Sequence, residues 1–130
     1  MKEQNIIEKF INKNNIFAVV GVSKDETKYG RKVFDDLKNA GYKAYPVNPK
    51  LEFILEDKCY ASLKDLPVKP DVVSFVVSPK VVESVIIECK ELGINKIWLQ
   101  PGSESEKVIN YCKDNNIECL HNQCIMLNLN

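Results

Sequence analysis

A run of five consecutive apolar residues, Ile16 to Val20, ends at Gly21 and constrains the fold more than any other part of the chain. A strand that is apolar on both faces has to be covered by helices on both faces. Two later runs, 72–77 and 94–99, have the same character, and each is followed by apolar residues at helical spacing. Strands that alternate with helices in this way form a parallel sheet. The sequence therefore predicts an α/β fold: a Rossmann-like, doubly wound parallel sheet of about five strands with helices on both faces.

The other elements follow from periodicity and from turn residues. Apolar residues at helical spacing predict a leading N-terminal helix within residues 1–14. Gly41 and Gly93 suit helix ends, because glycine readily adopts the left-handed conformation found there. We expect strands at 16–20, 43–47, 72–77, 94–99 and 117–120, with a short helical turn at 61–66 in an irregular stretch. No repeat, low-complexity segment or linker divides the chain, so residues 1–130 are predicted to form a single domain.

Two of the predicted helices begin with recognisable start signals. Ser78 is a typical N-cap residue, and Pro79 suits the first helical position. The segment Ser-Glu-Ser-Glu at 103–106 has the spacing of a capping box, with Ser103 as the cap and Glu106 bonding back to it. These signals predict helices directly after the third and fourth strands.

Charge and composition exclude two classes of partner. Eighteen basic residues balance eighteen acidic ones, so the chain has no net field to hold a nucleic acid. No apolar run approaches the roughly 20 residues that a membrane span needs. Five cysteines, an odd number without close pairs, are typical of reduced thiols rather than of a disulfide framework. We therefore expect a cytoplasmic protein without nucleic-acid or membrane partners and without a structural disulfide.

Residues with metal-binding or nucleophilic side chains gather late in the sequence. Cys112, Cys119, His121 and Cys124 include zinc-ligand types, but the short Cys-x-x-Cys spacing of structural zinc sites is absent. Burial as small core residues is the alternative that we favour for the cysteines. A reactive thiol at Cys124 stays open, although no base that would activate it is evident. His121 is the only histidine and no Gly-x-Ser-x-Gly elbow is present, so we predict neither metal ligands nor catalytic residues.

The first strand ends in a turn that suits a phosphate group. Ligands of open α/β sheets bind beyond the carboxyl ends of the strands. Gly21 allows a tight turn there, Ser23 supplies a hydroxyl, and the amides at the start of the next helix favour an anion. Gly30 would allow close approach to that anion or to a neighbouring strand. Because Ser23 occupies the second glycine position of Gly-x-Gly-x-x-Gly, the dinucleotide fingerprint is not matched, and a plain strand-to-helix turn remains the alternative.

The second strand ends in Asn48-Pro49-Lys50, where a nicotinamide-binding domain usually carries an acid for the ribose diol. An amide and a cation suit a phosphorylated ribose instead. Coenzyme A carries a 3′-phosphate on its adenosine ribose, so Asn48 as a donor and Lys50 as a positive charge are suitable partners. A solvated lysine after a turn is the alternative. Tyr29, beside the first turn, is a candidate for stacking on the adenine.

Five segments of the chain resemble, in their order and spacing, a known protein family. They are 17–23 (FAVVGVS), 41–49 (GYKAYPVNP), 59–67 (CYASLKDLP), 97–102 (IWLQPG) and 124–126 (CIM). The chain resembles the small stand-alone coenzyme A-binding proteins, which are related to the nucleotide-binding domain of the α subunit of succinyl-coenzyme A synthetase. The resemblance covers nearly all of residues 16–126. The sequence departs from the family pattern at Asn122 and Gln123, where an acidic and a basic residue are usual.

The resemblance implies a coenzyme A site with phosphates near 21–23, adenosine near 48–50 and 77–79, and the pantetheine arm near 100–102. The candidate cofactor-binding residues are Gly21, Val22, Ser23, Lys24, Tyr29, Gly30, Asn48, Pro49, Lys50, Val77, Ser78, Pro79, Gln100, Pro101 and Gly102. We predict a small cytosolic module that binds free or acylated coenzyme A without catalysis of its own. Four alternatives stay open: an NAD(P)-binding oxidoreductase, a subunit of an acyl-coenzyme A synthetase that needs a partner enzyme, a homo-oligomer, and a scaffold that has lost its ligand.

Overall fold

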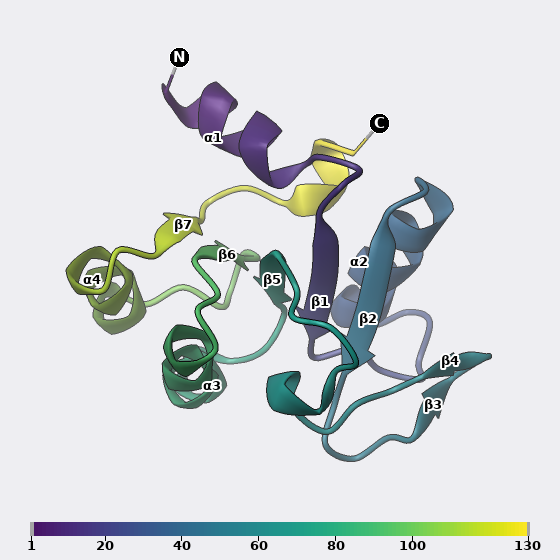
Figure 1. The fold of residues 1–130 in the computed structure, drawn as a ribbon. Coiled ribbons are helices and arrows are strands. Elements are labelled where there is room, and N and C mark those ends of the chain that lie inside the picture. Colours follow the sequence, from purple (N-terminus) through teal and green to yellow (C-terminus); the bar gives the residue numbers. More distant parts are fainter. Residues whose placement is uncertain (1, 130) are drawn as a thin grey trace.

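Five parallel strands form the centre of the molecule, in the order β2-β1-β5-β6-β7 (Figure 1). The computed structural model describes residues 2–129, so Met1 and Asn130 of the predicted domain lie outside it. The strands are β1 (Ile16–Val20), β2 (Lys43–Val47), β5 (Val72–Phe75), β6 (Lys96–Leu99) and β7 (Glu118–Leu120). The order reverses between β1 and β5, which is where an open α/β sheet has its ligand crevice. The predicted Rossmann-like parallel sheet is confirmed.

Helices cover both faces of this sheet. One face carries α1 (Lys2–Phe10), α2 (Tyr29–Asn39) and the 3-10 turn η2 (Ile125–Leu127), and the other carries α3 (Pro79–Glu91), α4 (Glu106–Asp114) and the 3-10 turn η1 (Leu63–Asp65). Successive residues of a strand point to opposite faces. Phe17 and Val19 of β1 accordingly belong to the first core, and Ala18 and Val20 belong to the second. Within the described residues, no helix is long and apolar enough to span a bilayer.

The C-terminal segment is held against the sheet through β6. Trp98, the only tryptophan of the chain, is fully buried, and its indole Nε1 donates to the carbonyl oxygen of Gln123 at 2.8 Å. The Trp98 ring meets Phe10 of α1 edge to face, with ring centroids 6.1 Å apart. The fully buried Ile125 donates its backbone N–H to Oε1 of Gln100 at 2.9 Å. Together these contacts place α1 and η2 on the same face.

Some element boundaries differ from the prediction. β5 ends at Phe75 instead of Val77, because the amide of Val77 donates to Oγ of Ser103 at 3.1 Å and leaves the sheet. β6 and β7 begin later than predicted, because the amides of Ile94 and Ile117 close the ends of the preceding helices. The helical turn predicted at 61–66 is limited to the three residues of η1.

The capping box predicted at Ser103 is wrong. Ser105 caps α4, since its Oγ accepts from the amide of Val108 at 3.2 Å. Ser103 is buried, and its hydroxyl lies 3.1 Å from the carbonyl oxygen of Phe75 and 2.6 Å from that of Val77. A tertiary contact therefore takes Ser103 away from the helix start, and it ties the loop after β6 to the end of β5.

A two-stranded antiparallel hairpin follows β2, where the sequence predicted only irregular structure. It consists of β3 (Phe53–Ile54) and β4 (Asp57–Lys58). The chain turns between them at Leu55, whose φ of 54° is in the left-handed region. The predicted irregular stretch is thus corrected to a short hairpin that projects beside the sheet (Figure 1).

Candidate functional site

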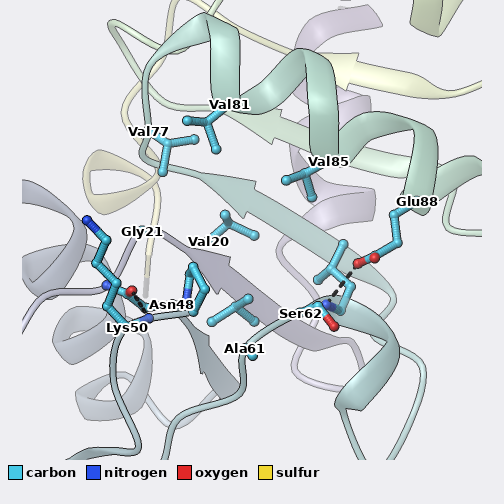
Figure 2. A pocket seen from close by; sticks show the side chains of 13 residues that line it. Val20, Gly21, Asn48, Lys50, Ala61, Ser62, Val77, Val81, Val85 and Glu88 are labelled. Atoms are coloured by element: carbon cyan, nitrogen blue, oxygen red, sulfur yellow. Dashed lines mark hydrogen bonds between the residues drawn. The ribbon is translucent and has the colours of Figure 1, made fainter.

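A cavity of about 390 Å³ lies at the carboxyl ends of β1 and β2, beside the point where the strand order reverses (Figure 2). Its volume falls within the range of small-molecule sites. The residues that line it are Val20, Gly21, Val47, Asn48, Pro49, Lys50, Ala61, Ser62, Leu63, Val77, Val81, Val85 and Glu88. Its walls are mostly aliphatic, and Lys50 and Glu88 lie at opposite ends in Figure 2. Such a slot suits a flat, weakly polar group that is joined to an anion.

Three backbone segments meet at Gly21. This residue has a φ of +105°, and its amide donates to the carbonyl oxygen of Val47 at 3.0 Å. A Cβ atom on Gly21 would lie 2.3 Å from the carbonyl oxygen of Val76. A Cβ atom on Gly30 would lie 2.1 Å from the carbonyl oxygen of Gly21. Only glycine therefore lets the start of α2 and the end of β5 close on this turn, and the close approach predicted for Gly30 is made to the turn itself.

The loop between β1 and α2 is organised by its own polar groups. Oγ of Ser23 accepts from the amide of Asp25 at 3.0 Å, so its hydroxyl hydrogen stays available to donate. Asp25 in turn accepts from the hydroxyl and the amide of Thr27, and these two bonds lower the pKa of the Asp25 carboxyl. The buried Arg31 reaches back from α2 and donates to the carbonyl oxygen of Lys24 at 2.9 Å. These bonds order the loop from within and tie it to α2.

Two helices begin at the cavity edge of the sheet without a side-chain cap. Lys28 is the N-cap residue of α2 and Ser78 that of α3, and neither makes a capping hydrogen bond through its side chain. Ser78 and Pro79 take up the predicted N-cap and first helical positions. The first amides of a helix have no acceptor within the helix, and the helix dipole favours an anion there. The start of α2, next to the Gly21 turn, is therefore suited to a phosphate group.

Asn48 connects two strand ends. Its Nδ2 donates to the carbonyl oxygen of Val22 at 2.8 Å, and its Oδ1 accepts from the amide of Lys50 at 2.9 Å. The sequence predicted a phosphate donor at this position, and the structure gives the Asn48 carboxamide a positioning role between the two turns. The Lys50 side chain, in contrast, is exposed at one end of the cavity (Figure 2).

The fourth predicted segment, 100–102, lies outside the cavity lining. Gln100 is fully buried; its Nε2 donates to Oγ of Ser74 at 3.1 Å, and its Oε1 accepts from Ile125. The hydroxyl of Tyr29 lies 2.9 Å from Sγ of Cys124 and 3.5 Å from Oε1 of Gln100. Burial, followed by the contact with Cys124, raises the pKa of Tyr29. We call these five residues the Gln100 cluster; they bond to one another and form no wall of the cavity.

The structure thus divides the predicted binding residues into groups. The cavity brings together Gly21, Asn48, Pro49, Lys50 and Val77. The remaining ones do not line it: Val22, Ser23, Lys24 and Gly30 form or support the neighbouring turn, Ser78 and Pro79 start α3, Tyr29 and Gln100 belong to the Gln100 cluster, and Pro101 and Gly102 are exposed.

Sequence reasoning missed the wall of the cavity that η1 and α3 contribute. Val81, Val85 and Glu88 are separated by four and three residues, so they share one face of α3. That spacing is visible in the sequence, but apolar residues at helical spacing indicate a core face, and Val85 belongs to such a set, so the pattern does not distinguish a cavity wall from the core. No local signal places Ser62 and Leu63 opposite them.

The late cysteines form no metal site. Among residues 2–129, no group of three or more His, Cys, Asp or Glu side chains is arranged to hold a metal ion. All five cysteines are free thiols. Cys112 lies on the buried face of α4, and the contact of Cys119 with it, together with burial, raises the pKa of Cys119.

Comparison with known families gives a match over most of the chain. The profile of a family described as "CoA binding domain" matches residues 15–130. The chain is 39% identical, over 93 residues and 71% of its length, to the α subunit of ADP-forming acetate-CoA ligase II from Pyrococcus furiosus. It spans only 20% of the length of that subunit and 11% to 16% of three further ADP-forming ligases that it matches.

Two solved structures share the fold over nearly their whole length. A conserved hypothetical protein from Pyrococcus furiosus is 40% identical, with a TM-score of 0.84, and the match covers 88% of this chain and 98% of that one. A hypothetical protein from Pyrococcus horikoshii is 28% identical, with a TM-score of 0.89, and the match covers 98% of this chain and 89% of that one. The fold therefore occurs in small proteins of similar length as well as in part of larger ligases.

Proposed function

Because the chain belongs to the CoA binding domain family, we propose that its cavity binds the adenosine 3′-phosphate end of coenzyme A, free or acylated. One juxtaposition carries the proposal: an aliphatic slot extends from the exposed Lys50 and the Gly21 turn, at the strand switch point, toward Glu88. Adenine is flat and finds apolar walls in this slot. The ribose phosphate is an anion that the Lys50 ammonium group complements.

The diphosphate of coenzyme A is proposed to lie at the start of α2. The uncapped amides of that helix and the hydroxyl of Ser23 are donors beside the Gly21 turn. The buried Arg31 supports this turn from behind through the carbonyl oxygen of Lys24. The route of the pantetheine arm toward 100–102 stays a prediction.

We propose binding without catalysis by this chain. The residues that line the cavity include neither a cysteine nor a histidine, and the Cys124 thiol lies in the Gln100 cluster. Its two charged lining side chains, Lys50 and Glu88, lie at opposite ends of the cavity and so do not form an acid and base pair (Figure 2).

Thermal unfolding in the presence of candidate cofactors tests the proposal. A ligand that binds only the folded state stabilises it by about 2.7 kcal/mol at 100 times its dissociation constant. We expect coenzyme A to raise the midpoint of unfolding by several degrees, dephospho-coenzyme A to raise it less, and NAD or NADP to leave it unchanged. A larger rise with NAD or NADP than with coenzyme A would support the oxidoreductase alternative instead.

A second candidate function is that of a cofactor-binding subunit in a larger acyl-coenzyme A synthetase. The observation that favours it is the match to the α subunit of a ligase of which this chain spans a fifth. Native mass spectrometry of the protein isolated from its own cells tests this candidate. A complex with a second kind of chain would support it, and a monomer or homo-oligomer that carries coenzyme A would favour the stand-alone role.

A further inference from the structure

Glu88 closes one end of the cavity, and neither the phosphates nor the ribose of the proposed ligand accounts for it. It is half-buried and follows Val81 and Val85 along one face of α3. It is the only acidic residue in the cavity lining, and Figure 2 places it at the end opposite Lys50. A carboxylate in apolar surroundings is unfavourable unless its oxygens find donors.

One oxygen of Glu88 has such a donor, and the other is available. Oε1 accepts from the amide of Leu63 in η1 at 2.9 Å. Within residues 2–129, no hydrogen bond to Oε2 is found. The bond to Leu63 fixes the carboxylate at the junction of α3 and η1, the two elements that form this wall. A fixed carboxylate with a free oxygen is suited to accept from a ligand donor.

The proposed function, on which this inference rests, sets the orientation of the ligand. With the phosphates near Gly21 and Lys50, the base of the nucleotide extends toward the Glu88 end (Figure 2). We propose that Glu88 is a specificity-determining residue, whose free oxygen accepts a hydrogen bond from the exocyclic amino group of adenine. A base with a keto group in that place would set oxygen lone pairs against the carboxylate. The site therefore distinguishes adenine from 6-oxopurines.

The test compares coenzyme A with an analogue in which hypoxanthine replaces adenine, by calorimetric titration of the full chain. A hydrogen bond to a charged group changes affinity by about 10- to 100-fold, and we expect the wild type to prefer coenzyme A by at least about tenfold. In Glu88→Gln, the oxygen bound to Leu63 is retained and an NH₂ group replaces the free oxygen. Because NH₂ donates to a keto group, the preference should fall below about threefold or reverse.

Glu83→Gln is the matched control. Glu83 lies on the same helix, but its carboxylate is 3.6 Å from Nζ of Lys107 and does not line the cavity. This variant should keep the wild-type preference. If coenzyme A binds and Glu88→Gln also keeps the wild-type preference, the role of Glu88 is overturned while the proposed function stands. If the wild type does not bind coenzyme A, the proposed function fails, and the role of Glu88 fails with it.

Discussion

The edge of the sheet at the carboxyl ends of the strands has two halves, which differ in whether their polar groups are bonded within the protein. In the open half, at the ends of β1, β2 and β5, the helices α2 and α3 lack side-chain caps and Lys50 is exposed beside the cavity. In the closed half, at the end of β6, the polar side chains bond inward: Gln100 within its cluster, Ser103 to β5 and Ser105 to the start of α4. Both halves follow strands of the same sheet.

The difference shows where this fold places its stabilising polar contacts. Buried polar groups have to be paired within the protein, whereas groups next to solvent or ligand can remain available. The closed half stabilises the C-terminal segment, and the open half keeps donors for an anion. Removing a polar side chain should therefore affect stability in the closed half and binding in the open half, whereas a change in the backbone packing of the open half should affect both. The following predictions test that separation.

The largest effect is expected for Gly30→Ala, which changes the packing that shapes the open half. The new Cβ would lie 2.1 Å from the backbone oxygen of Gly21, so α2 or the turn must shift. We expect a loss of about 3 kcal/mol in unfolding free energy, and coenzyme A binding should be lost with the turn geometry. Chemical denaturation and titration measure both. Gly102→Ala is the control for backbone strain alone: its φ of +99° disfavours alanine, but a Cβ there meets nothing within 4 Å, whereas Gly30 has the ordinary backbone of helix α2. A Gly30→Ala variant as stable as Gly102→Ala would contradict the packing role.

Gln100→Leu should destabilise the closed half without affecting binding. It leaves Oγ of Ser74 and the amide of Ile125 without their partner. Unpaired buried groups of this kind cost about 2 kcal/mol. Urea unfolding should show this loss, while the affinity of the folded protein for coenzyme A stays within about twofold. A large loss of affinity at unchanged stability would instead support a direct role of Gln100 at the pantetheine arm.

Lys50→Ala should have the reverse effect. The Lys50 side chain is exposed, so stability is expected to be unchanged. Loss of a charge partner for the 3′-phosphate should weaken coenzyme A binding by about tenfold, equivalent to about 1.4 kcal/mol. Dephospho-coenzyme A, which lacks that phosphate, should bind both proteins equally. Lys64→Ala removes an exposed lysine outside the cavity lining and is the control. Equal weakening of both ligands would place Lys50 at another part of the cofactor.

The smallest effect is expected from the comparison of a capped helix start, that of α4, with an uncapped one, that of α3. Ser105→Ala removes the bond to the amide of Val108 and should cost about 1 kcal/mol of unfolding free energy. Ser78→Ala removes no such bond and should cost less than about 0.5 kcal/mol. Equal losses for the two variants in urea unfolding would show that the halves do not differ in this way.

The sequence predicts the first two strands well because their signals are local. The apolar run 16–20 ends at a glycine and the run 43–47 ends before Asn48, and the bounds of β1 and β2 agree with these ranges. The choice between Ser103 and Ser105 as the cap of α4 was not predictable, because the contact of Ser103 with β5 decides it. A local pattern identifies the cap of a helix correctly only when no distant segment binds the same side chain.

In the candidate site too, local sequence signals predict some residues, and contacts between distant segments decide the others. Gly21, Asn48 and Lys50 follow directly from strand ends, and the cavity contains all three. The role of Glu88 depends on η1 lying against α3, and these elements are separated by an entire strand of the sheet. Gln100 also follows a strand end, yet its burial under the C-terminal segment removes it from the cavity.

The burial of Trp98 gives the protein an intrinsic fluorescence reporter. As the only tryptophan, it alone supplies the indole emission. Its hydrogen bond to Gln123 and its contact with Phe10 make this emission sensitive to changes in the C-terminal segment and in α1. Its ring belongs to the core under α1 and η2, whereas the cavity is walled by η1 and α3. A red shift of the emission would thus signal detachment of α1 or the C-terminal segment, and filling of the cavity by an adenine nucleotide should leave the emission nearly unchanged.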